Sequence, residues 1–184
     1  FMIMGFCMGV CSGFAIPVAH KFGAKDYSGM RQVVANSVWL SAIFAVVITI
    51  AVSLLCRPIL RLMRTPDNII DGSYNYIIII FLGIPVVFLY NMTAAILRSL
   101  GDSRTPVVFL VTAAILNIFL DVFCIVVIPM GVAGAAVATV VSQAIAGFAC
   151  LIYMRKKFSI LTLSQDERKW NRDYAAKLCN MGIP

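Results

Sequence analysis

The sequence contains few charged residues, and this scarcity excludes an ordinary soluble domain. Of its 184 residues only 12% are charged and one is histidine, whereas 61% are hydrophobic and the mean hydropathy is +0.96. A soluble chain of this length could not bury so much apolar surface. The composition therefore predicts a protein that resides in the lipid bilayer.

The sequence also lacks the patterns of a metal centre or of a disulfide framework. Five of the six cysteines, Cys179 being the sixth, lie in apolar stretches or at their ends. Cys7 and Cys11 fall on one face of a helix, but no histidine or acidic residue stands near them. Metal sites need such additional ligands, so core packing is the better interpretation of these cysteines.

Long apolar stretches dominate what is present. A helix needs about 20 apolar residues to cross the hydrocarbon core. Five stretches reach this length, namely 1–19, 33–56, 74–97, 106–128 and 132–154. They are too long and too continuous for barrel strands, and helices satisfy their own backbone in lipid. The prediction is an all-α polytopic membrane protein with five transmembrane helices.

The basic residues are distributed unequally between the two faces of this arrangement. Of the 15 lysines and arginines, only Arg57, Arg61 and Arg64 fall on one face, and the others precede or follow the spans on the opposite face. The positive-inside rule places the larger set in the cytoplasm, so the net charge of +7 reflects topology and does not indicate a nucleic-acid partner. Residue 1 is then outside, without a charged signal region before it, which indicates an internal piece of a longer protein.

The stretch ILNIFLDVF, residues 115–123, places polar side chains inside an apolar span. Asn117 and Asp121 are four residues apart, so they share one helical face. The stretch is followed by Pro129, Met130 and Gly131, which predict a tight helical hairpin with the next span.

Depth in this hairpin can be counted from its connection. Asp121 and Thr139 each lie seven residues from the ends of the two spans, at a predicted depth of about 10 Å. Asn117 and Gln143 lie one turn deeper on the same two faces. The count predicts that these four residues form one buried polar cluster.

Asp121 is the only charged side chain well inside any of the five spans. A charge at this depth costs on the order of 3 kcal/mol, and such residues usually mark an ion or substrate pathway. The alternative is a neutral aspartic acid in an interhelical hydrogen bond, worth only about 0.6 kcal/mol. The sequence therefore favours a Na⁺ or proton site at Asp121.

Three motifs carry a resemblance to a known family. The segments LRSLGDSRTPVVFL, NIFLD and MGVAGAAVATVVSQ closely resemble the multidrug and toxic compound extrusion (MATE) family of cation-coupled antiporters. This resemblance implies twelve helices in two six-helix lobes. Residues 1–154 would be helices two to six of the N-terminal lobe, and residues 155–184 the cytoplasmic linker helix and the start of the next transmembrane helix. The first helix and the second lobe would be missing partners from the same polypeptide.

The resemblance also implies a function and a site. The family's cation or proton site has an acid on the first helix, which is absent here, together with residues matching Asn117, Asp121 and Thr139. Gln143 rests on the depth count alone. The implied protein is a multi-pass antiporter of the cytoplasmic membrane, not an enzyme. It uses Na⁺ or H⁺ as the coupling ion, needs no other cofactor, and exports small cationic amphipathic compounds.

Other interpretations stay open at this stage. A lipid-linked oligosaccharide flippase of the same superfamily would share the spans, but no lysine or arginine lies well inside them to line its cavity. An intramembrane aspartyl protease would need a second buried aspartate. A membrane subunit that does not transport would not depend on Asp121. Pro85 is a candidate hinge within its span.

The charged tail has its own expected structure. Residues 164–179 mix Trp170, Tyr174 and Leu178 with charged residues. This mixture suits either an amphipathic helix on the anionic leaflet or a solvated linker.

Overall fold

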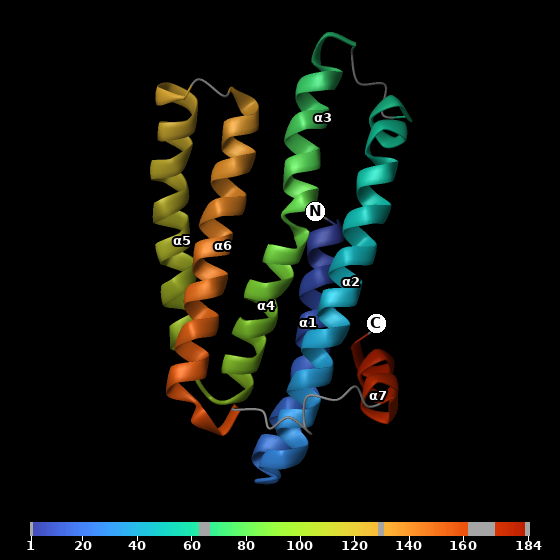
Figure 1. The fold of residues 1–184 in the computed structure, drawn as a ribbon, viewed down its shortest axis with the longest axis vertical. Helices are drawn as coiled ribbons and strands as arrows, with labels where there is room; N and C mark the ends of the chain where they lie inside the picture. Colours follow the sequence, from blue (N-terminus) through green and yellow to red (C-terminus); the bar gives the residue numbers. More distant parts are fainter. Residues whose placement is uncertain (1, 63–66, 129–130, 162–171, 183–184) are drawn as a thin grey trace.

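Helices make up almost all of the described chain (Figure 1). The computed structural model describes residues 2–62, 67–128, 131–161 and 172–182. In chain order the elements are α1 (Met2–Gly23), α2 (Tyr27–Leu62), α3 (Asp67–Leu82), α4 (Ile84–Ser99), α5 (Arg104–Val122), the π-helix η1 (Phe123–Val127), α6 (Val132–Lys157), the 3₁₀-helix η2 (Ser159–Leu161) and α7 (Arg172–Gly182).

Four segments in the described residues are long and apolar enough to cross a membrane. They are Tyr27–Cys56, Asp71–Ser99, Arg104–Val127 and Val132–Lys157. These segments coincide with four of the predicted spans, and the protein is a multi-pass membrane protein. The remaining predicted span corresponds to α1, which packs beside α2 and α4 but ends in His20 and Lys21. Its crossing of the membrane stays a prediction.

The centre of the bundle is α4, which lies between α6 and the α1–α2 pair (Figure 1). Its residues 90–97 are buried on every face of the helix. Burial on every face means that other helices surround this part of α4. The cluster around it includes Phe14 of α1, Met30 of α2 and Ile96 of α4, each nearly inaccessible to solvent.

The third span is broken where α3 meets α4. Gly83 separates the two helices, and Pro85 occupies the first turn of α4, where a missing N–H removes no intrahelical hydrogen bond. Gly83 packs so closely against Val140 of α6 that an added β-carbon would overlap the valine side chain. The break therefore lies at the predicted hinge proline, while movement at Pro85 stays a prediction.

The C-terminal helix α7 packs against α1 and α2 near one end of the bundle (Figure 1). Ala175 and Leu178 are buried in this contact, and Cys179 packs at its edge. The predicted linker helix thus exists from Arg172 onward, and its apolar face covers protein, which neither sequence interpretation anticipated. Residues 162–171 of the tail, including Trp170, lie outside the described residues.

Candidate cation or proton site

The hairpin of α5 and α6 brings the predicted polar residues to one helix interface. The two helices lie side by side along their length (Figure 1). Small side chains on α6, among them Gly134, Ala136 and Ala138, are buried and allow its neighbours to approach closely. Asn117 and Asp121 on α5 and Thr139 on α6 are all partly buried.

A hydrogen bond across the hairpin joins two of the predicted residues. The Asn117 Nδ2 donates to Thr139 Oγ1 at 3.4 Å, and Thr139 Oγ1 donates to the carbonyl of Ala135 at 2.9 Å. The threonine hydroxyl is therefore held by both contacts. The amide oxygen of Asn117 remains an acceptor for another group.

Asp121 contributes an unpaired carboxylate to this interface. Its Oδ1 atom is buried and makes no hydrogen bond to any residue that the structure describes. A buried polar atom without a partner costs on the order of 1–3 kcal/mol, so it is rarely left without a reason. The atom is positioned to accept a proton or to coordinate a cation.

The pairing across the hairpin differs from the sequence count by one turn. The count placed Thr139 level with Asp121, whereas the hydrogen bond joins Thr139 to Asn117. The π-helical segment η1, Phe123–Val127, also lies between Asp121 and the connection. A π turn holds more residues than an α turn, so it brings Asp121 slightly closer to the hairpin end than the α-helical count assumes.

The π-helix is itself a feature that sequence reasoning missed. The segment begins two residues after Asp121, and its residues FCIVV carry no polar or glycine signal. Such segments occur often at functional sites, where they alter the direction of adjacent side chains.

Gln143 joins the cluster less closely than predicted. It lies one turn after Thr139 on α6 and is partly buried. Within the described part of the hairpin it makes no hydrogen bond to Asn117, Asp121 or Thr139. Its role as a ligand stays a prediction.

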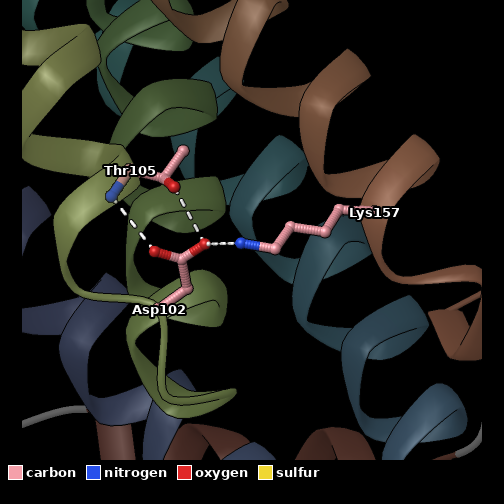
Figure 2. Close-up of polar contacts among 3 residues, drawn as sticks. All are labelled: Asp102, Thr105 and Lys157. Atoms are coloured by element: carbon pink, nitrogen blue, oxygen red, sulfur yellow. Dashed lines mark hydrogen bonds and ion pairs between the residues drawn. The ribbon is translucent and has the colours of Figure 1, made fainter.

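A second polar cluster joins the same two helices at their opposite ends (Figure 2). Asp102 accepts hydrogen bonds from the Thr105 backbone N–H at 3.1 Å and from the Thr105 hydroxyl at 2.8 Å. Lys157, in the last turn of α6, lies 2.8 Å from the same carboxylate. These contacts lower the pKa of Asp102 to about 2, first through the Lys157 hydrogen bond and then through the Thr105 N–H.

The sequence signal for this second cluster lies in GDSRTP. An aspartate three residues before a threonine at the start of a helix is a capping pattern, because the carboxylate accepts the N–H groups that the helix leaves free. Its partner Lys157 lies 55 residues away and could not be read from the pattern.

Three of the cysteines lie in the apolar interior, in agreement with the core-packing interpretation. Cys7, Cys11 and Cys150 are buried among apolar side chains of the main cluster.

Residues 1–123 match the sequence model of the MatE family. Two proteins of Bacillus subtilis (strain 168) are similar, both named as probable multidrug resistance proteins. YoeA is 31% identical over 191 residues, covering 100% of this chain and 41% of its own length. YpnP is 32% identical over 182 residues, covering 99% of this chain and 40% of its own length. The chain thus spans about 40% of the length of these relatives.

Solved structures of two conformational states also match. One is an inward-facing conformation of a multidrug resistance MATE family transporter, with a TM-score of 0.90, 25% identity, and coverage of 98% of this chain and 41% of that chain. The other is an outward-facing conformation, with a TM-score of 0.89, 25% identity, and coverage of 99% and 41%.

Proposed function

The chain belongs to the MatE family, and from this premise we propose that it is the N-terminal lobe, without its first helix, of a Na⁺- or H⁺-coupled antiporter. Residues 1–154 would form the lobe and residues 155–184 the linker to a second lobe. The exported compounds would be small, organic, cationic and amphipathic. The observation that carries this proposal is the buried, unpaired Oδ1 of Asp121 in the α5–α6 hairpin.

The geometry supports oxygen coordination at this position. Asp121 offers a carboxylate, Asn117 an amide oxygen and Thr139 a hydroxyl, and Na⁺ would be held by such oxygen atoms. The hydrogen bond from Asn117 to Thr139 fixes two of the three groups before any ion arrives. A proton could occupy the same carboxylate instead and would remove its charge.

Coupling requires that the ion change the relative stability of two access states. An ion can shift such an equilibrium only by binding one state more tightly than the other. Neutralising Asp121 removes an uncompensated charge from the hairpin, so the state in which the site is occupied is stabilised. If that state releases the organic cation outward, entry of Na⁺ or H⁺ from outside drives export.

The similarity to both conformations bears on how the lobe would move. This segment resembles the inward-facing and the outward-facing structures almost equally, which supports a lobe that keeps its fold while its orientation changes. The break at Gly83 and Pro85 is the position in this lobe where a smaller internal bend would meet least resistance.

The test uses the full-length protein in sealed vesicles with an imposed Na⁺ or pH gradient. Wild-type protein should drive export of a fluorescent organic cation, and removal of the correct gradient should stop it. Asp121→Asn should reduce gradient-driven export by more than about tenfold while substrate binding is retained, because asparagine neither takes up a proton nor offers a full charge.

Two variants that keep Asp121 should reduce export less than Asp121→Asn does. Thr139→Val removes one hydroxyl and leaves the charge, so it should reduce export least. Asn117→Ala removes the amide oxygen and the donor to Thr139, so its effect should lie between the other two. Wild-type export by the Asp121→Asn protein would show that the carboxylate is structural and would remove Asp121 from the coupling site.

A further inference from the structure

An apolar groove lies between α2, α4 and α6. Its volume is about 560 Å³, which is within the range of small-molecule sites. Val34 and Val46 of α2 mark its extent along that helix, and Pro85 and Ile96 mark it along α4. The polar cluster at Asp121 does not contribute to it, so the groove is separate from the proposed ion site.

The length of the groove matches one leaflet of a bilayer. Twelve residues separate Val34 from Val46, which is about 18 Å of helix. The hydrocarbon core is about 30 Å thick, so one leaflet is about half of that. Val34, Ile96 and Arg155 lie toward the helix ends that carry most of the basic residues, and Val46 and Pro85 lie near the middle of their spans. The groove thus runs from a basic membrane surface to mid-depth.

The chemistry of the walls favours a lipid over an organic cation. Arg155 is the charged residue among the described lining residues, and no carboxylate accompanies it there. Thr93 also lines the groove, but its hydroxyl donates to the carbonyl of Leu89 at 2.8 Å. Trp39, more than half exposed, stands at the wall as tryptophans do near lipid headgroups.

We propose that this groove binds one anionic phospholipid, with an acyl chain between α2, α4 and α6 and the phosphate at Arg155. The fit has three parts: an apolar channel of leaflet length, a cationic group at the surface end, and no anionic group that would repel a phosphate. Lys156 and Lys157 follow Arg155 in the last turn of α6 and add positive potential at this surface end of the groove. The inference requires insertion in a membrane and does not depend on ion-coupled export.

Trp39 supplies the reporter for the test. The full-length protein is prepared with Trp39 as its one tryptophan, the others replaced by phenylalanine, and placed in vesicles of phosphatidylcholine. A small fraction of the lipid is then dibrominated phosphatidylglycerol or, separately, dibrominated phosphatidylcholine, whose bromines quench a nearby indole. The anionic lipid should quench Trp39 with about fivefold higher apparent affinity, the effect of one basic side chain near the membrane surface.

A pair of charge-matched variants separates the groove from the general charge of the surface. Arg155→Gln and Lys156→Gln remove one positive charge from the same helical turn, but Lys156 does not line the groove. Arg155→Gln should make the two brominated lipids quench equally, whereas Lys156→Gln should keep most of the preference.

Three results would overturn the proposal. Equal quenching of the wild type by both lipids would mean that no anionic lipid is selected. An equal loss in both variants would assign the preference to surface charge alone. Absence of quenching by either lipid would mean that another part of the protein covers the groove.

Discussion

Asp102 and Asp121 sit at opposite ends of the same α5–α6 pair, and their surroundings differ completely. Asp102 accepts two hydrogen bonds from Thr105 and forms an ion pair with Lys157 (Figure 2). Asp121 has a buried oxygen that accepts no hydrogen bond within the described residues. The fold satisfies Asp102, whereas the described residues supply no partner to the buried oxygen of Asp121.

We interpret this difference as that between a structural carboxylate, Asp102, and the proposed functional one, Asp121. Contacts to Asp102 stabilise its ionised form and hold the α4–α5 connection against the end of α6. Asp121 has no such contacts among the described residues, although a charge inside a span is costly. The expectation is that changes at Asp102 alter stability and changes at Asp121 alter transport.

The largest effect should appear when the two aspartates are compared in gradient-driven export. Asp102→Asn should leave export within about twofold of wild type, because asparagine caps a helix nearly as well as aspartate. Asp121→Asn should lower it by more than about tenfold. The measurement is initial export rate per folded transporter in vesicles. Similar losses of export rate in both variants would contradict the assignment of a structural role to Asp102 and a transport role to Asp121.

The second effect is on stability in detergent and should have the opposite order. Asp102→Ala removes the acceptor of the Thr105 N–H and should destabilise the protein by about 1 kcal/mol, as loss of a helix cap does. Asp121→Asn should leave stability unchanged or raise it, since it removes a charge that has no partner. Thermal unfolding of the purified full-length variants provides the measurement. A large destabilisation by Asp121→Asn would assign that carboxylate to the fold.

The third effect is the pH dependence of the Asp102 contribution. Because the pKa of Asp102 is lowered from 3.8 to about 2, its ionised form is favoured in the folded state, and the benefit is complete above pH 4. The stability difference between wild type and Asp102→Asn should therefore shrink as the pH falls from about 4 to about 2. Unfolding curves of both proteins across this range test the sign. A difference that grows toward low pH would contradict the assigned contacts.

The smallest effect is expected at Lys157. Its side chain is 49% exposed, and exposed ion pairs contribute little because water and salt screen them. Lys157→Met removes the ion pair and the cation–π contact of the ammonium with the Tyr153 ring, and should still destabilise the protein less than Asp102→Ala. The same unfolding assay at low and high salt distinguishes the ion pair from packing. A loss equal to that of Asp102→Ala would mean that Lys157 is the main support of the cluster.

Sequence reasoning predicted that the candidate residues lie in one hairpin, but not which of them are hydrogen-bonded. The four-residue spacing of Asn117 and Asp121 and the short connection after the span were enough to place them on one face of a hairpin. The count set Thr139 level with Asp121, whereas the structure shows a hydrogen bond to Thr139 from Asn117, and a π-helix occupies the end of that span. The sequence FCIVV does not predict a π-helix, because its residues have ordinary helix and strand preferences.

The linker helix illustrates a different limit. The alternation of apolar and charged residues predicted an amphipathic helix, and the described part from Arg172 forms one. The sequence did not show whether the membrane or the protein covers the apolar face of this helix, because either would bury Ala175 and Leu178. In the structure this face packs on α1 and α2.

The sequence by itself determined the membrane location, the number and order of most spans, and the presence of one costly carboxylate, because these depend on hydropathy, segment length and local spacing. Tertiary structure decided which polar groups are satisfied. Asp102 and Asp121 are the same residue type near the same two helices, yet in the described part of the chain only Asp102 pairs with a cation, a lysine 55 residues away. A hydrogen bond depends on distances of a few tenths of an ångström between distant segments, and only the packed bundle fixes those distances.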